Sequence, residues 1–313
     1  TGITNTQTFA GTTLQAGGSQ TTATLNGGTA INLNLGAITR NTGAAVDFAV
    51  SATGLGTGGV STSNANDAGG LLGGYATVNA GADFATIATG KVAAYASYAT
   101  TYAAGANVNN GILTTIGGSA LTIHSLRFNN ATTLSLDTTA GLTVTSGGIL
   151  MTPTVGANTV TLTGGTLTTP SADLVFHVWD NNAASYLSVG SKITGNVGLT
   201  KVGPGMLIVK NPANDFVGTI NIGAYQRDFK NFFGSVRFPQ PDFSATSCST
   251  PRMRSALTAA GGRQARRPGR RSARPGASRG RRCRRRGRRQ TWSPPPRDLS
   301  PGRLILTTRR GGS

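Results

Sequence analysis

The sequence predicts an all-β protein, and within that class a β-solenoid, whose short strands wind into coils that stack on one another. Short apolar runs recur about every 8–12 residues between Gly, Asn and Asp turn signals, with almost no helical periodicity. Gly and Asn tolerate the backbone angles of tight corners, and low charge suits stacking because like charges repel along a ladder. A β-sandwich, which needs longer strands, is the competing all-β architecture. The clearest alternation is at Leu134 and Leu136, Leu142 and Val144, Val160 and Leu162, and Ile220 and Ile222.

The expected strands lie in order along residues 1–223. If each coil takes about 20 residues, this part of the chain makes about 11 coils. The Gly-rich stretch 51–74 is expected to form a long surface loop. At 91–104, tyrosines spaced for one helical face leave a short helix open, but a strand followed by a loop is favoured. Strands are expected within 24–36, 119–130, 132–137, 141–150, 158–169, 172–179, 205–210 and 218–223.

Charge divides the chain into a nearly neutral body and a basic tail. Of the 29 Lys and Arg residues, six lie in residues 1–223, where seven Asp residues bring the net charge to −1. Residues 224–313 hold the other 23 together with three Asp residues, a net charge of +20. An argument from overall charge therefore concerns the tail alone.

Cysteine usage and hydropathy restrict the class of protein further. Cys248 and Cys283 both lie in the tail, so no disulfide is expected in the body. No stretch approaches the roughly 18 consecutive apolar residues that a membrane-spanning helix needs. The chain starts at Thr1 without a recognisable signal peptide, and we therefore expect a fragment or a processed product.

The stretch "GLTKVGPGMLIVKNPANDFVGTINIG" (198–223) carries the most specific pattern. A Gly-Leu-Thr-Lys strand, a Gly-x-Gly turn and an apolar strand precede an Asn-rich corner, an aromatic-x-Gly step and a last alternating strand. This order resembles the autotransporter-associated β-strand repeat, and a more diffuse resemblance extends over most of 25–223. The resemblance implies a right-handed parallel β-helix passenger, exported and displayed at the cell surface. The positions that match the repeat are Gly198, Lys201, Gly203, Pro204, Gly205, Asn211, Asn214, Phe216, Gly218 and Gly223.

Two lysines flank the turn of this repeat. Gly203 and Gly205 should permit the corner and Pro204 should stiffen it. Lys201 and Lys210 are expected to project outward from either end, where their charges stay hydrated and protect the edge of the stack.

Enzymatic chemistry is not expected. β-Helix lyases and hydrolases need clustered carboxylates, or carboxylates with a Lys or Arg base, and the chain has no Glu. Asp173 and Asp180 bracket a strand as turn residues do, and His124 is expected to be a surface or hydrogen-bonded histidine. No catalytic residue, metal site or cofactor is predicted. The alternative is a glycan-binding or carbohydrate-active face between Asp173 and Lys192, with contacts from His177, Trp179, Asp180 and Tyr186.

Residues 224–313 are predicted to be a disordered tail, because they lack the apolar residues of a core. From 244 to 313 there are 20 Arg and no Lys. Selection for charge alone would not exclude lysine, so a change of reading frame near 224–250 is the first hypothesis. A genuine tail that binds polyanions such as nucleic acid is the alternative.

The predicted organisation is an N-terminal solenoid part with the Gly-rich loop at 1–118, a second solenoid part with the repeat at 119–223, and the tail at 224–313. The predicted function is non-enzymatic, that of a structural or adhesin-like passenger fragment of a bacterial surface protein. The expected partner is a surface ligand of unknown identity, such as a glycan or another cell surface. Nucleic acid is expected only if the tail is genuine. The expected location is secreted or at the cell surface or outer membrane.

Overall fold

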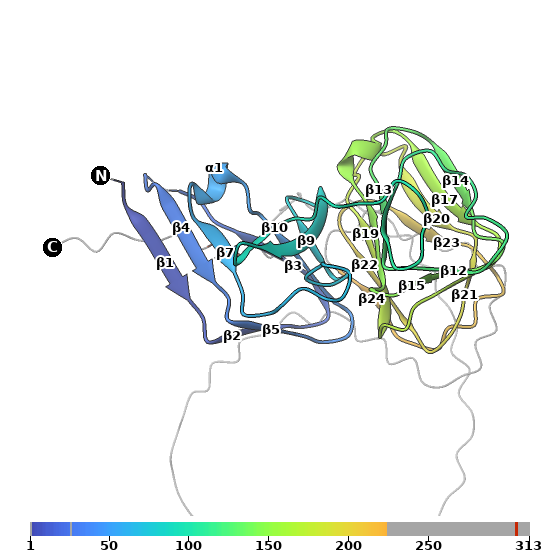
Figure 1. The fold of residues 1–313 in the computed structure, drawn as a ribbon, viewed down its shortest axis with the longest axis horizontal. Coiled ribbons are helices and arrows are strands. Elements are labelled where there is room, and N and C mark those ends of the chain that lie inside the picture. Colours follow the sequence, from blue (N-terminus) through green and yellow to red (C-terminus); the bar gives the residue numbers. More distant parts are fainter. Residues whose placement is uncertain (1, 26, 224–303, 306–313) are drawn as a thin grey trace, which may run out of the picture. The chain divides into compact units, whose positions relative to one another are not determined.

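A computed structural model describes residues 2–25, 27–223 and 304–305, all of which belong to one compact unit (Figure 1). Most strands pair in parallel with the strand one coil away, which confirms the β-solenoid. The stack makes about eight turns, fewer than expected. The reason is that many coils are longer than the assumed 20 residues. Leu187 pairs with Leu207, 20 positions later, whereas Val160 pairs with Leu187, 27 positions later.

The first stack of coils has three sides, with strand orders β1-β4-β7, β2-β5 and β3-β6-β8, the last of which is part of a six-stranded sheet. Apolar residues lie one above another inside it, with Leu33 over Val60 and Phe48 over Val78. The strands are β1 (Thr4–Thr8), β2 (Gly11–Leu14), β3 (Gly17–Thr22), β4 (Ala30–Asn34), β5 (Ala37–Arg40), β6 (Ala44–Phe48), β7 (Gly59–Ser61) and β8 (Ala76–Val78).

The prediction of a long surface loop at 51–74 is wrong. This stretch contains a four-residue helix, α1 (Ala52–Leu55), as well as β7, and it buries Leu71 in contact with Phe84. The loop prediction failed because the large apolar residues here are few and widely spaced, although Leu55, Val60, Leu71 and Leu72 are all buried.

The parallel order is interrupted between the two stacks. β9 (Asp83–Ala88) pairs antiparallel with β8, and β10 (Lys91–Ala94) pairs antiparallel with β9. The remainder of 91–104 has no helix, so the strand-and-loop interpretation of this stretch is confirmed.

The second stack again has three sheets, with orders β11-β13-β16-β19-β22-β24, β12-β15-β18-β21 and β14-β17-β20-β23. Their inward side chains form one apolar core, in which a ladder of Leu126, Ile149 and Phe176 is fully buried. Burying such a side chain stabilises the fold by about 1.5–3 kcal/mol. A short 3₁₀ turn, η1 (Pro153–Val155), lies at one corner.

Most strands of the second stack lie within the segments expected from the alternation or from the repeat, but the strands at 107–110, 186–189 and 192–193 lie outside them. The strands of this stack are β11 (Asn107–Asn110), β12 (Leu121–Ile123), β13 (Ser125–Phe128), β14 (Leu134–Asp137), β15 (Leu142–Val144), β16 (Gly148–Met151), β17 (Thr159–Thr163), β18 (Thr166–Thr168), β19 (Asp173–Val178), β20 (Tyr186–Val189), β21 (Lys192–Ile193), β22 (Gly198–Val202), β23 (Leu207–Val209) and β24 (Ile220–Ile222).

Predictions about the tail fall almost entirely outside the described residues. The exception is β25 (Leu304–Ile305), which pairs in parallel with β3. Within the part of the chain that the structure describes, no helix has the length and apolar character needed to cross a membrane. The division at residue 118 stays a prediction.

Candidate functional site

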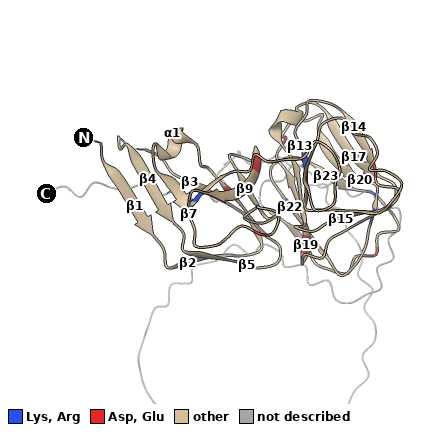
Figure 2. Ribbon diagram, in the orientation of Figure 1, with Lys and Arg blue, Asp and Glu red and all other residues tan. Residues whose placement is uncertain are grey.

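Polar side chains gather where strands of the first stack contact the sheet that contains β13, β16, β19 and β22. Charged residues are sparse elsewhere on the ribbon (Figure 2). Four groups carry nearly all the long-range polar contacts here, centred on His124, Asp173, His177 and Arg127.

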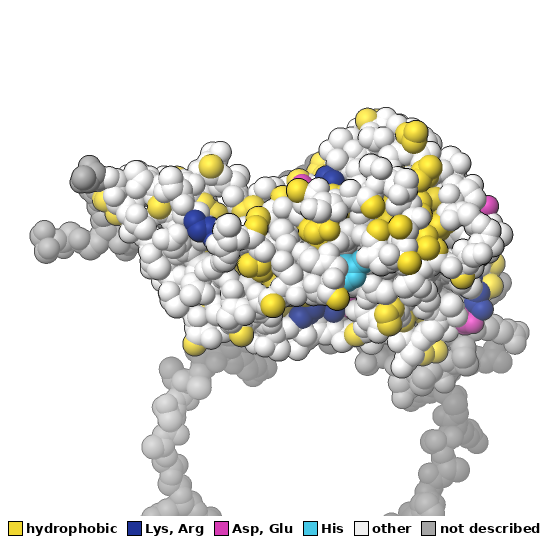
Figure 3. Space-filling view, in the orientation of Figure 1, with side chains coloured by type: hydrophobic (Ala, Val, Ile, Leu, Met, Phe, Trp, Pro, Cys, Tyr) yellow, Lys and Arg dark blue, Asp and Glu magenta, His cyan; other side chains and the backbone are white. Residues whose placement is uncertain are grey.

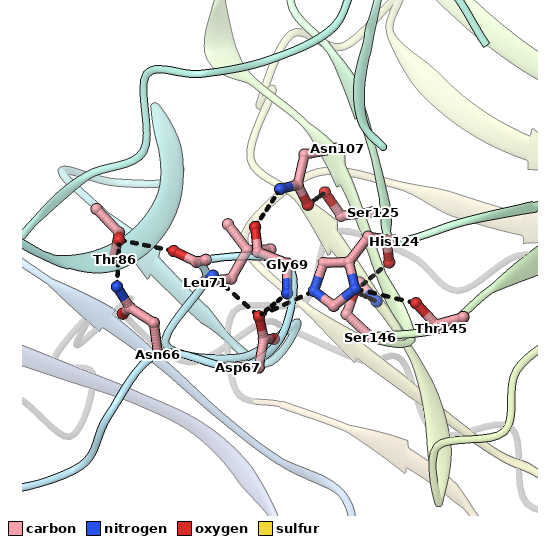
Figure 4. A network of polar contacts seen from close by, with 12 residues as sticks. Asn66, Asp67, Gly69, Leu71, Thr86, Asn107, His124, Ser125, Thr145 and Ser146 are labelled. Atoms are coloured by element: carbon pink, nitrogen blue, oxygen red, sulfur yellow. Dashed lines mark hydrogen bonds and ion pairs between the residues drawn. The ribbon is translucent and has the colours of Figure 1, made fainter. Parts of the chain in front are cut away.

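His124 lies in a hydrogen-bonded network that joins the 62–74 segment to the second stack (Figure 4). Its Nε2 lies 3.0 Å from Asp67 Oδ1 and its Nδ1 lies 3.0 Å from Thr145 Oγ1. Asp67 also accepts hydrogen bonds from the backbone N–H groups of Gly69 and Leu71. The expectation of a hydrogen-bonded histidine is confirmed.

The order carboxylate, imidazole and hydroxyl in this network is that of a hydrolase triad. However, a Cβ at Gly69 would lie only 2.0 Å from the His124 ring, so the backbone of Gly69 covers the imidazole. A substrate has no room to approach between His124 and Thr145. The network therefore holds the loop in place and does not activate a nucleophile.

Asp173 is a fully buried carboxylate with four hydrogen bonds. Arg40 Nη2 donates to both of its oxygens, at 2.7 and 2.8 Å, and Gly43 N donates at 3.2 Å. The Thr200 hydroxyl gives the fourth bond. Arg40 also lies over the Tyr75 ring, 5.2 Å from its centroid. Asp173 is therefore a structural ion-pair partner rather than the turn residue expected from the sequence.

His177 is fully buried on the same strand. Its Nε2 lies 2.9 Å from Gly74 O, and the Phe84 ring packs edge-on against it at 5.9 Å. Burial is the main cause that lowers the pKa of His177, to about 4. The imidazole is therefore neutral at pH 7 and donates its Nε2 proton to the Gly74 carbonyl oxygen.

Arg127 makes the fourth polar group. Its Nη2 lies 2.9 Å from Asp83 Oδ1 and 3.0 Å from Ala82 O, and its guanidinium lies over the Tyr98 ring at 4.6 Å. Burial raises the pKa of Asp83, and the nearby Arg127 charge partly opposes this effect. This carboxylate is already paired and is not positioned as a free acid.

Glycines let the two stacks approach closely at these contacts. A Cβ at Gly81 would lie 1.8 Å from Trp179 Cδ1, and one at Gly74 would lie 2.4 Å from Ser146 O. A small apolar cluster of Ala45, Val175 and Val202 fills the space between them. Sequence reasoning missed these contacts, since nothing in the local pattern shows which glycines meet a partner far along the chain.

The predicted glycan face between Asp173 and Lys192 is not an open surface. His177 and Asp180 are buried, so neither can contact a sugar, and this part of the prediction is wrong. The cause is that β19 is covered on both sides, by the core and by the first stack. Trp179 and Tyr186 are half-buried, and a role for them in sugar binding stays a prediction. Asp180 is a turn residue as expected, because it accepts a hydrogen bond from Asn182 N.

The repeat glycines lie where chains pass closely. Gly203 has a φ of 85°, and a Cβ there would lie 2.4 Å from Val178 O. A Cβ at Gly205 would lie 2.2 Å from Asp180 O, and a Cβ at Gly218 would lie 2.3 Å from Gly198 N. A Cβ at Gly223 would lie 2.7 Å from Gly18 N. Pro204 lies between the two corner glycines.

The asparagines and the aromatic residue of the repeat hold the next corner. Asn211 Nδ2 donates to Gly190 O at 2.7 Å, and Asn214 Oδ1 accepts from Ile193 N at 2.7 Å. Phe216 packs against the core of the second stack. These side chains connect one coil to the coil before it, as a repeat unit requires.

Lys201 does not project outward, and that prediction is wrong. Its side chain is 3% exposed and faces the interior, on the ladder position of Phe176 and Ile222. Its ammonium donates to Gly203 O, and burial lowers its pKa to about 8. A lysine can lie inward here because its ammonium group donates a hydrogen bond to the carbonyl oxygen of Gly203 at the corner. Lys210 is exposed, as expected.

No candidate metal site is found in the described ranges 2–25 and 27–223. No three His, Cys, Asp or Glu side chains come together there in a way that could hold an ion.

Comparison with known proteins gives one informative relative. The chain is 32% identical over 218 residues to a protein named Adhesin BmaC autotransporter, from Brucella suis biovar 1 (strain 1330). The match covers 64% of this chain and 6% of the relative, so the chain spans a small part of that protein. No family model matches the chain. No solved structure matches it. The similarity and the β-solenoid together fit an autotransporter passenger-type protein.

Proposed function

We propose that this chain is a non-enzymatic, adhesin-like segment of a long surface-displayed passenger, and that its β-solenoid presents a ligand-binding surface outside the cell. The observation that carries the proposal is the coincidence of a stacked parallel β-fold with similarity to a protein named an adhesin. The expected location at the cell surface is supported by the same similarity. The ligand that we propose is another cell or its glycans.

The state of the carboxylates supports a role without catalysis. Asp173, Asp83, Asp67 and Asp215 each lie within an ion-pair distance of a cationic or histidine side chain. These four carboxylates are held by structural partners, whereas glycoside hydrolysis uses a pair of acids that face the substrate.

The character of the surface suits a broad, low-charge contact. The face in Figure 3 is mostly uncharged and polar, with scattered apolar side chains and few charges. Surfaces rich in hydroxyl and amide groups bind through hydrogen bonds and shape rather than through long-range attraction. We therefore expect binding by the body to depend little on salt.

A bead-retention assay with the whole chain tests the proposal. Beads coated with folded chain are washed over a monolayer of cultured epithelial cells, with and without soluble heparin. The matched control is the same chain after heat denaturation, which keeps composition and charge and loses the fold. Retention several-fold above this control, unchanged by heparin, supports the adhesin role.

Two other results would point elsewhere. Retention that heparin abolishes, or that the denatured chain shows equally, would assign binding to the basic residues 224–313 as a polyanion-binding tail. Retention no greater than that of uncoated beads would reject an adhesin role for epithelial surfaces.

A further inference from the structure

One side of the second stack is an open sheet made of β14, β17, β20 and β23 (Figure 1). The first stack makes its polar contacts with a different sheet, at Arg127, Asp173 and His177. On β14 and β17 the residues that face the core, such as Leu136 and Leu162, alternate with residues that face outward. The outward positions of this sheet are therefore available to a ligand.

Four outward side chains on this sheet carry hydroxyl groups that the fold does not use. Register places Ser135 beside Thr161, and Thr159 beside Tyr186. Ser135 is exposed and the other three are half-buried. None of the four hydroxyl groups is bonded to another residue that the structure describes. Thr163, on the same strand, differs because its Oγ1 donates to a carbonyl oxygen of β14 at 3.3 Å.

The four side chains form a compact group. Neighbouring strands of a sheet lie about 4.8 Å apart, and residues two positions apart on one strand are separated by about 7 Å. The pairs Ser135–Thr161 and Thr159–Tyr186 therefore make a small lattice of hydroxyl groups across three strands. Its extent is comparable with that of a short oligosaccharide.

Tyr186 adds an aromatic ring to this lattice. It lies between Thr159 on the coil before and Met206 on the coil after, whose carbonyl oxygen accepts from the N–H that follows Tyr186 at 3.0 Å. The 180–185 corner separates it from the buried His177. Sugar rings have an apolar C–H face and a rim of hydroxyl groups. An aromatic face beside free hydroxyl groups matches both features.

The charge of this face also matches an uncharged ligand. The outward positions of β17 and β20 hold Thr, Tyr and Ser residues. At the border, Asp137 ends β14 and Lys210 follows β23, so one negative and one positive charge cancel. Asp137 also accepts a hydrogen bond from Thr139 N at 2.9 Å. A polyanion gains no net attraction here, whereas a neutral ligand can bind without stripping water from a charge.

We propose that this face binds an uncharged glycan, with a sugar ring stacked on Tyr186 and sugar hydroxyl groups bonded to Thr159 and Thr161. Ser135 extends the same site onto the neighbouring strand. Hydroxyl side chains both donate and accept hydrogen bonds, so they can pair with the mixed donors and acceptors of a sugar. The proposal rests on the adhesin-like function proposed above and names the surface and the class of ligand through which that function acts.

Binding of the full chain to a printed glycan array tests the proposal. The array carries uncharged oligosaccharides of glucose, galactose, mannose and N-acetylglucosamine, together with heparin fragments. Moderate salt suppresses attraction to the basic residues 224–313. We expect the folded chain to bind at least one uncharged oligosaccharide, and the heat-denatured chain to bind none. The half-saturating concentration of the chain on that oligosaccharide is then measured for each variant.

Four variants locate the site. Tyr186→Ala should raise the half-saturating concentration about ten-fold, because the stacking surface is lost. Tyr186→Phe keeps the ring and should stay within about three-fold of the natural chain. Thr161→Val keeps the shape and removes one hydroxyl group, for an expected loss of about three-fold. Thr143→Val is the matched control, because Thr143 lies at an outward position of the other open sheet, between Thr122 and Thr168.

Circular dichroism verifies that each variant keeps the fold. If Tyr186→Ala does not fold, the comparison of Thr161→Val with Thr143→Val still decides the question. The proposal is overturned if no uncharged oligosaccharide binds, or if only heparin fragments bind. It is also overturned if the Tyr186→Ala and Thr161→Val variants bind as the natural chain does, or if Thr143→Val weakens binding as much as Thr161→Val.

The bead-retention assay separates this proposal from the adhesin role on which it rests. Equal retention of beads coated with the natural chain and with Tyr186→Ala, both above the denatured control, would reject this face and leave the adhesin role standing. Retention lost in Tyr186→Ala alone would support both. Retention of neither would reject the adhesin role for epithelial surfaces, and the array would still decide whether this face binds a glycan.

Discussion

Arg40 binds Asp173 across 133 positions of sequence, with its Nη2 at 2.7 and 2.8 Å from the two carboxylate oxygens. The Asp173 side chain is fully buried, and the Arg40 side chain is 16% exposed. This pair connects the first stack of coils to β19 of the second.

Replacing Asp173 should therefore destabilise the fold. Asp173→Asn leaves Arg40 buried without its counter-charge, and breaking a buried pair in this way typically costs about 3–5 kcal/mol. Urea unfolding followed by circular dichroism should show a clearly lower midpoint. Asp215→Asn is the matched control, because its pair with Lys192 is exposed and surface pairs contribute little. Equal midpoints for the two variants would contradict a structural role for Asp173.

His177 should make stability depend on acid. Its pKa is lowered from 6.5 to about 4, so the unfolded chain binds a proton at higher pH than the folded chain does. Stability is unaffected above pH 6.5 and falls as pH drops from 6.5 to 4, by roughly 3 kcal/mol in total.

The measurement compares His177→Gln with the natural chain at several pH values. Gln keeps an N–H that can donate to Gly74 O but does not titrate. The difference in unfolding free energy between the two proteins should change between pH 7 and pH 4 in favour of the variant. A difference that stays constant with pH would show that His177 is not the titrating group.

Lys201 is a buried amine whose removal should stabilise the protein at neutral pH. Burial lowers its pKa from 10.5 to about 8, so keeping it charged at pH 7 costs free energy that grows as pH falls from 10.5 to 8. Lys201→Met keeps a side chain of similar length and removes this cost. It also removes the hydrogen bond to Gly203 O, which offsets part of the gain. We expect a gain of roughly 1–3 kcal/mol at pH 7 in thermal or urea unfolding.

Two companion variants separate charge from packing. Lys201→Ala leaves a cavity in the core and should destabilise the protein. Lys210→Met, at the exposed lysine of the same repeat, should change little. A loss of stability in Lys201→Met would mean that the bond to the corner carbonyl outweighs the cost of burying the amine.

A side chain at Gly81 should destabilise the fold, because the φ of Gly81 is 69° and a Cβ would lie 1.8 Å from Trp179. Gly90 has a φ of 75° with nothing within 4 Å, so Gly90→Ala reports the backbone strain alone, about 1 kcal/mol. Gly81→Ala should cost about 1–3 kcal/mol more, since the ring must move. Trp179 fluorescence should also change in Gly81→Ala and not in Gly90→Ala. Identical effects of the two substitutions would show that this contact is loose.

The sequence predicts the second stack better than the first for a physical reason. Around Leu134 and Leu136, inward residues are apolar and outward residues polar, so the alternation is visible. In β1 and β3 the inward residues are polar as well, as at Gln7 and Ser19, and the alternation vanishes although the strands form.

Contacts at the candidate sites were harder to predict because they depend on distant parts of the chain. The pairing of Arg40 with Asp173, and of His177 with Gly74, follows from how the stacks meet and not from spacing. The inward direction of Lys201 depends on the register of β22 with β19. A hydrated lysine and an inward lysine look the same in a sequence.

The separation of Arg40 from Asp173 also implies an order of folding. Within a stack, pairing partners lie 18 to 30 residues apart, as between Asn107 and Ser125 and between Val46 and Ala76, so each coil can form on the one before it as the chain lengthens. The first coils, however, must wait for residue 173 before Arg40 is neutralised and the Gly-lined contacts close. A chain that is made N-terminus first therefore carries an uncovered face until residue 173 has been made, and we expect the closing of this face to be a late step in its folding.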